Sequence, residues 1–204
     1  ETTNVRVHHG LLRVALEMAP ALSKELVSKA VQWLAGPCRP LSGLEYAKLV
    51  RHLAAGGAES EAIDLAATLF AVSGDANHPG SDVAPLHISS WEYETSLEVA
   101  LSSLAETAPS LTLEFVSGLL EEAIAVGERA RGASGENDGG VDLSHFWRPA
   151  IEDHDQNRDH DNLPGLLVKA TRDVALAAAS RLPESVPELV AALEARSRRV
   201  FRRI

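Results

Sequence analysis

Three stretches of the sequence share one pattern and decide its fold: VALEMAPALSKELV at 14–27, VALSSLAETAPSLTLEFV at 99–116, and VALAAASRLPESVPELV at 174–190. Each stretch runs from Val-Ala-Leu to a proline, namely Pro20, Pro109 or Pro183. Five residues after that proline come Glu, then Leu or Phe, then Val. Because proline cannot continue a helix interior but suits the first turn of the next helix, each stretch predicts a helix, a tight turn and a second helix.

The rest of the chain follows the same plan. Apolar residues at helical spacing run from Leu44 to Ala54 and from Glu59 to Val72, and Gly56-Gly57 supplies the turn between them. Pairs of roughly 35 to 45 residues are the size of HEAT and armadillo repeats. The predicted units are 4–36, 41–73, 90–130 and 163–204, with connecting loops at 74–90 and 131–162.

These units predict an all-α protein. A low aromatic content of 4% fits helix packing better than a β-sandwich. Since a lone helix pair buries only one side, we expect the four pairs to stack into a right-handed α-α superhelix, a single HEAT-like solenoid domain over residues 1–204. An irregular compact helical bundle is the alternative.

The last stripe of apolar residues predicts one helix that continues to the end of the sequence. Its predicted face holds Val186, Leu189, Val190, Leu193, Val200, Phe201 and Ile204. A helix that stops without a C-cap suggests a segment of a longer polypeptide.

Charge and cysteine content limit the possible partners. The net charge of −10 disfavours non-specific binding to nucleic acid or anionic lipid, although five arginines fall within the final nine residues. That cluster indicates either a solvated helix end or a site for an acidic partner. With no apolar run of about 18 residues and a single cysteine, Cys38, we expect a cytoplasmic protein without a membrane partner.

The loop at 142–161 carries the densest set of metal-ligand side chains, and a metal-dependent hydrolase is therefore an alternative function. The weak candidate ligands are His145, His154 and His160. No recognised metal spacing, P-loop or nucleophile elbow occurs, so we expect no catalytic residue and no cofactor. The alternative role of this loop is structural, with carboxylates that cap the helix starting near Leu163.

The leading hypothesis is a non-enzymatic module that binds a protein partner or other domains of its own parent chain. Large flat side chains and arginines dominate binding energies, so the candidate contacts are Trp91, Tyr93, Trp147, Arg148, Arg198 and Arg202. Trp33 is expected in the core. Nucleic-acid binding is a further alternative, which requires the C-terminal arginines to join Arg129, Arg131 and Arg148 in one stripe.

One string adds a resemblance. WRPAIEDH at 147–154, followed by Gln156-Asn157, Lys169, Arg172-Asp173 and the ending VFRRI, resembles a helical-repeat region of large bacterial NACHT-like (STAND) ATP-binding proteins. Trp91-Glu92-Tyr93-Glu94 at a helix start fits the same resemblance, which covers about residues 90–204. It implies a sensor or scaffold segment beside an NTPase domain elsewhere in the parent chain, often in defence against phage.

Overall fold

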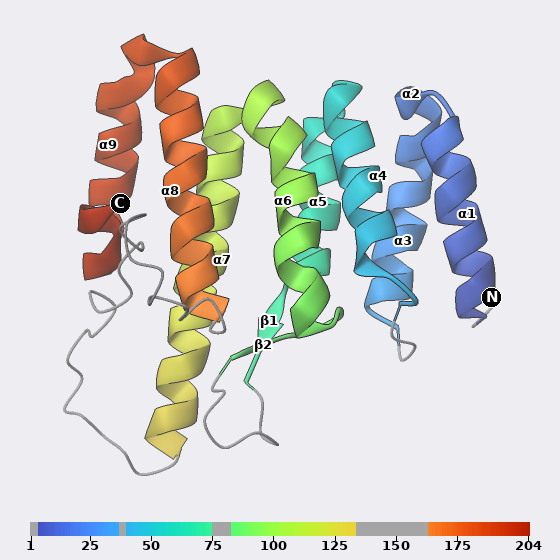
Figure 1. Cartoon of the computed structure of the whole chain (residues 1–204), viewed down its shortest axis with the longest axis horizontal. Helices are drawn as coiled ribbons and strands as arrows, with labels where there is room; N and C mark the ends of the chain where they lie inside the picture. The colour runs from blue at the N-terminus through green and yellow to red at the C-terminus, as the bar shows by residue number, and fades with distance from the viewer. Residues whose placement is uncertain (1–3, 37–39, 75–82, 134–162) are drawn as a thin grey trace. The chain divides into compact units, whose positions relative to one another are not determined.

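The computed structural model describes residues 4–36, 40–74, 83–133 and 163–204, and these are mostly helical, which confirms the all-α prediction (Figure 1). The chain divides into two compact units. The first contains Glu1–Ala71 and Pro85–Phe115, and the second contains Val72–Ala84 and Val116–Ile204. The predicted division into four repeat units within one domain stays a prediction.

The first unit arranges its helices in two layers. Its elements are α1 (Val5–Glu17), α2 (Pro20–Ser23), η1 (Lys24–Leu26), α3 (Val27–Leu34), α4 (Gly43–Ala55), α5 (Glu59–Leu69) and α6 (Ser90–Thr107). Helix α4 is central, because α1 and α6 pack on either side of it. Helices α3 and α5 pack on each other behind this row, and α5 also contacts α4 (Figure 1).

The turn between α1 and α3 follows the predicted proline signal. Pro20 occupies the first turn of α2, as the repeated motif predicts. The buried Ser23 hydroxyl donates to the Ala15 carbonyl oxygen at 2.7 Å, which ties α2 back to α1. Trp33 on α3, which was expected in the core, is only half-buried, and it stacks on His8 of α1 with 4.3 Å between ring centroids and 7° between planes. These contacts hold α3 against α1.

The turn between α4 and α5 depends on two glycines with different roles. Gly57 has φ +77°, a left-handed conformation that glycine adopts without steric cost. Gly56 allows a close approach, because a Cβ atom there would overlap the Cβ and Cγ atoms of Pro20. The predicted Gly56-Gly57 turn is therefore confirmed, and it also fixes where α2 meets the end of α4.

The core of the first unit surrounds α4 and the start of α6. Tyr93 is fully buried, and its ring meets Phe70 edge to face with 5.3 Å between centroids. Its hydroxyl donates to the Phe70 carbonyl oxygen at 2.9 Å, and burial raises the pKa of this phenol well above its usual range. This bond satisfies a carbonyl at the C-terminal end of α5.

Two short strands occur at the predicted loop 74–90: one directly precedes the loop and the other lies inside it. Strand β1 (Val72–Ser73) pairs with β2 (Ala84–Pro85) in a two-stranded sheet. The sequence did not predict this pairing, because two-residue strands carry no detectable alternation of apolar and polar residues.

The second unit contains most of α7 (Pro109–Ala133), then α8 (Leu163–Arg181), η4 (Pro183–Ser185), α9 (Val186–Glu194) and η5 (Arg199–Arg203). Helix α7 begins at Pro109 and η4 at Pro183, so the other two proline signals also mark helix starts. The chain thus places a helix, a turn and a second helix at all three copies of the motif.

The prediction of one helix from Val186 to Ile204 is wrong. Helix α9 ends at Glu194, and the chain passes through an extended Arg198 (φ −85°, ψ 138°) before η5. The physical reason is that ending α9 early allows Val200 and Phe201 of η5 to be buried. Val190, on the face predicted for one long helix, stays exposed. Ion pairs from Arg196 and Arg198 to glutamates of α7 hold the residues between α9 and η5 in this conformation.

Candidate interaction groove

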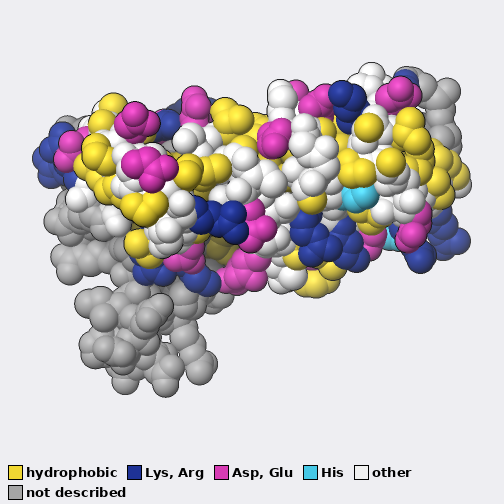
Figure 2. All heavy atoms as spheres, turned by 90° about the horizontal axis from the view of Figure 1, so that it is seen from above, with side chains coloured by type: hydrophobic (Ala, Val, Ile, Leu, Met, Phe, Trp, Pro, Cys, Tyr) yellow, Lys and Arg dark blue, Asp and Glu magenta, His cyan; other side chains and the backbone are white. Residues whose placement is uncertain are grey.

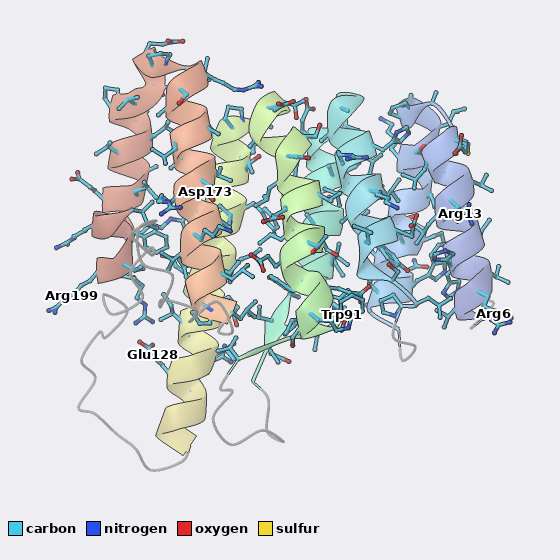
Figure 3. The ribbon with its side chains drawn as sticks, in the orientation of Figure 1. Arg6, Arg13, Trp91, Glu128, Asp173 and Arg199 are labelled. Atoms are coloured by element: carbon cyan, nitrogen blue, oxygen red, sulfur yellow. The ribbon has the colours of Figure 1, made fainter. Side chains whose placement is uncertain are left out.

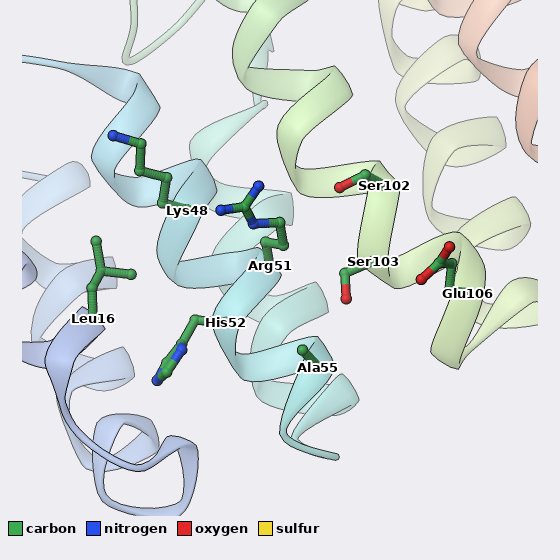
Figure 4. Close-up of a pocket in the computed structure, with 8 residues that line it drawn as sticks. All are labelled: Leu16, Lys48, Arg51, His52, Ala55, Ser102, Ser103 and Glu106. Atoms are coloured by element: carbon green, nitrogen blue, oxygen red, sulfur yellow. The ribbon is translucent and has the colours of Figure 1, made fainter.

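Three helices of the first unit line a groove. Two adjoining hollows, of about 480 Å³ and about 300 Å³, share Leu16 and Lys48 in their walls. The larger is lined by Leu16, Lys48, Arg51, His52, Ala55, Ser102, Ser103 and Glu106 (Figure 4). The smaller is lined by His9, Arg13, Leu16, Glu17, Glu45 and Lys48. Together they cross the outer row of α1, α4 and α6.

Histidine and lysine side chains shape the floor of the groove. His52 Nε2 lies 2.9 Å from the Met18 carbonyl oxygen, and because a carbonyl only accepts, the imidazole must donate. This bond fixes α4 against the end of α1. Lys48 is bonded to Glu45 one turn earlier at 2.9 Å, so its charge is partly neutralised.

Two arginines of the groove carry positive charges that no acidic side chain of the groove pairs with. Arg13 and Arg51 are both exposed, and neither forms an ion pair with any residue that the structure describes. In Figure 4 the Arg51 guanidinium extends between α4 and α6, on the side of α6 that carries Ser102 and Ser103. The Ser102 hydroxyl donates to the Val99 carbonyl oxygen at 2.8 Å, which leaves its lone pairs free to accept.

The lining of the groove determines which ligands it can hold. Within 4–36, 40–74, 83–133 and 163–204, no group of three or more His, Cys, Asp or Glu side chains could hold a metal ion. Most side chains that line the groove are charged or polar, and Leu16 and Ala55 are its apolar members. Guanidinium and ammonium groups with nearby hydroxyls are suited to carboxylate or other anionic groups.

Comparison with known proteins gives no match: no family model, no curated protein and no solved structure is similar to the chain. No function can therefore be assigned to the chain from a similar protein. Among its described helices, none is long and apolar enough to cross a membrane.

The two aromatic candidates at the start of α6 have opposite environments. Trp91 is 81% exposed and stands at the end of α6 in Figure 3, as a partner contact requires. Tyr93 is fully buried against Phe70, so its expected place on a binding surface is corrected to the core. Residues two apart on a helix point about 200° apart, so only one of the two rings can face the core, but the WEYE string does not indicate which one.

Arg198 is also corrected, from a partner contact to an internal one. Its guanidinium donates to both carboxylate oxygens of Glu128 on α7, at 2.5 and 2.8 Å. Arg196 similarly bonds Glu121 of α7 at 2.7 Å, with its guanidinium carbon 6.0 Å from the centre of the Phe201 ring. Arg202 is exposed and remains a candidate.

These pairs weaken the nucleic-acid alternative. Arg129, Arg196 and Arg198 each bond a glutamate on α7, so a phosphate would have to displace a carboxylate at each position. Arg131 has no described side chain, and Arg148 lies outside the described residues. Trp147, Cys38 and the metal candidates His145, His154 and His160 also lie outside them.

Sequence reasoning missed the groove residues Arg13, Lys48 and Arg51. A signal was present in Lys48-Leu-Val-Arg51-His52, a local cluster of basic side chains in an acidic chain. The contributions of α1 and α6 carried no such signal, because only folding brings them beside α4.

The C-terminal contacts give a prediction about local stability. Replacing Arg198 by glutamine should destabilise the docked segment by about 1–2 kcal/mol, because a bidentate, partly buried pair is lost. Faster amide exchange at residues 199–202 would be measured by mass spectrometry. Arg202→Gln is the matched control, since Arg202 is exposed; equal exchange in both variants would contradict the role of Glu128.

Proposed function

We propose that this chain is a non-enzymatic helical-repeat module that binds an acidic segment of a protein partner along the groove of α1, α4 and α6. The supporting observation is that Arg13 and Arg51 stand exposed and unpaired within the groove of a chain whose net charge is −10. Positive side chains that stay unpaired in a chain with an excess of acidic residues favour an anionic group on the partner.

The size of the groove suggests an extended peptide. Neighbouring helix axes are about 8–10 Å apart, so three helices in a row span roughly 18 Å from first to last. An extended chain advances about 3.3 Å per residue, and about five or six residues would cross the groove. Carboxylates of such a segment would meet Arg51 and Arg13 in turn, and Ser102 would accept a backbone N–H.

The finer architecture belongs to the same proposal. A right-handed superhelix of four stacked pairs is supported by the recurring motif and by the two layers of the first unit. Its resemblance to repeats of NACHT-like proteins suggests a cytoplasmic sensor or scaffold segment of a larger regulatory NTPase. A Gly-Lys-Ser/Thr loop elsewhere in the parent reading frame would support that role, and a parent chain without one would overturn it.

Selection from a random peptide library displayed on phage, with the immobilised chain as bait, tests the groove. We expect the enriched peptides to be rich in Asp and Glu. Arg51→Glu should weaken their binding about three- to tenfold at low salt, because one attractive contact becomes repulsive. Fluorescence anisotropy with a synthetic copy of the best peptide would measure the change.

The matched control is Arg129→Glu, which changes the net charge equally but lies in the second unit, where Arg129 pairs with Glu122. Equal weakening by both variants would show a general charge effect and no groove site. Enrichment of neutral or basic peptides would also count against the proposal.

A further inference from the structure

Helix α1 carries an apolar stripe on its outer side. Val7, Leu11 and Val14 on α1 are 43%, 41% and 57% exposed, and Met18, the residue that caps its C-terminal end, is 39% exposed. Figure 2 shows hydrophobic side chains at the edge of the first unit where α1 lies. Single exposed apolar side chains are normal, whereas a continuous row indicates a surface that another molecule covers.

The spacing of the stripe fits a helix as the covering element. Intervals of four, three and four residues are those of a coiled-coil seam. Gly10 lies beside the stripe in mid-helix, and a Cβ atom there would meet nothing within 4 Å, so a neighbouring helix could approach closely.

The order of the intervals points to a second copy of the same helix. Four, three, four reads identically in both directions, so a two-fold axis would pair α1 with an antiparallel α1. Leu11 would then face Val14 of the second copy, and Val7 would face Met18. The stripe is self-complementary without any change of conformation.

Charges on α1 support the antiparallel arrangement. Arg6 and Glu17 are exposed near opposite ends of the helix, and neither side chain has an ion-pair partner in the described part of the chain. Figure 3 shows Arg6 and Arg13 on α1. In the pairing above, Arg6 lies within two residues, roughly 3 Å along the axis, of Glu17 of the second copy. A parallel pair would bring like charges together.

We infer that this chain forms a two-fold symmetric dimer through antiparallel contact between the α1 stripes of two copies. A helix of 13 residues spans about 20 Å, so the contact is smaller than a standard stable interface. The dimer is therefore weak and depends on concentration. This inference stands apart from the acidic ligand of the groove, since the apolar stripe and the groove occupy different sides of α1 and only Glu17 borders both.

Sedimentation equilibrium of the full chain between about 10 µM and about 1 mM tests the dimer. We expect the average mass to rise from one chain towards two. Leu11→Glu and Val14→Glu should each abolish the rise. Leu176→Glu is the control, because Leu176 is 58% exposed on α8 outside the stripe. A constant single-chain mass for the unaltered protein would overturn the inference, leaving the stripe to a different partner.

Charge exchange tests the direction of pairing. Arg6→Glu and Glu17→Arg should each weaken the dimer several-fold, because each places like charges opposite one another. The double variant R6E/E17R should regain the original strength. A double variant as weak as either single one would contradict the antiparallel arrangement.

Discussion

Replacing Gly56 by alanine should destabilise the first unit by about 2–3 kcal/mol, because the new methyl group would overlap the ring of Pro20. A flexible side chain could rotate away, but the atoms in the way belong to a closed ring at the start of α2. The whole turn between α1 and α3 would have to move. Urea unfolding followed by circular dichroism would measure the loss.

Gly118→Ala is the matched control for that experiment. Gly118 is also a helical glycine, on α7, but a Cβ atom there would meet nothing within 4 Å. Alanine should stabilise this helix by about 0.5–1 kcal/mol, since it restricts the unfolded chain. If Gly56→Ala were also neutral or stabilising, the close approach of α2 to the end of α4 would be wrong.

Tyr93→Ala should have the largest effect of any single change proposed for this chain, about 3–5 kcal/mol. The substitution would empty a fully buried position against Phe70 and leave the Phe70 carbonyl without its donor. Tyr93→Phe keeps the volume and removes only the hydroxyl, so it should cost about 1–2 kcal/mol. Thermal and urea unfolding of both variants would separate the packing contribution from the hydrogen bond.

Trp91→Ala provides the comparison from the same helical turn. Because Trp91 is 81% exposed, its removal should change the free energy of unfolding by less than about 0.5 kcal/mol. Similar losses for Trp91→Ala and Tyr93→Ala would mean that the start of α6 is packed differently from the arrangement described above.

Local signals in the sequence were enough to predict the helices. Proline in a first turn and glycine in a left-handed turn restrict the backbone directly, and Pro20, Pro109 and Gly57 lie where those rules require. The failure at the C-terminal end has a different origin. Apolar spacing continued through Ile204, but the contacts that end α9 come from Glu121 and Glu128, some 70 residues earlier.

Surface residues could not be assigned in the same way. Exposure of an aromatic side chain depends on which side of its helix meets the core, and Trp91 and Tyr93 differ only in that respect. The groove joins helices separated by tens of residues, and no pattern within α1 or α6 marks Arg13 or Ser102 as parts of the groove that contains Arg51.

The parallel rings of His8 and Trp33 give the first unit an internal optical reporter. Indole emission depends on polarity and on quenching by an adjacent imidazole, so the signal of Trp33 should shift when α1 separates from α3. With Trp91 and Trp147 replaced by phenylalanine, the separation of these two helices could then be followed in real time without a label.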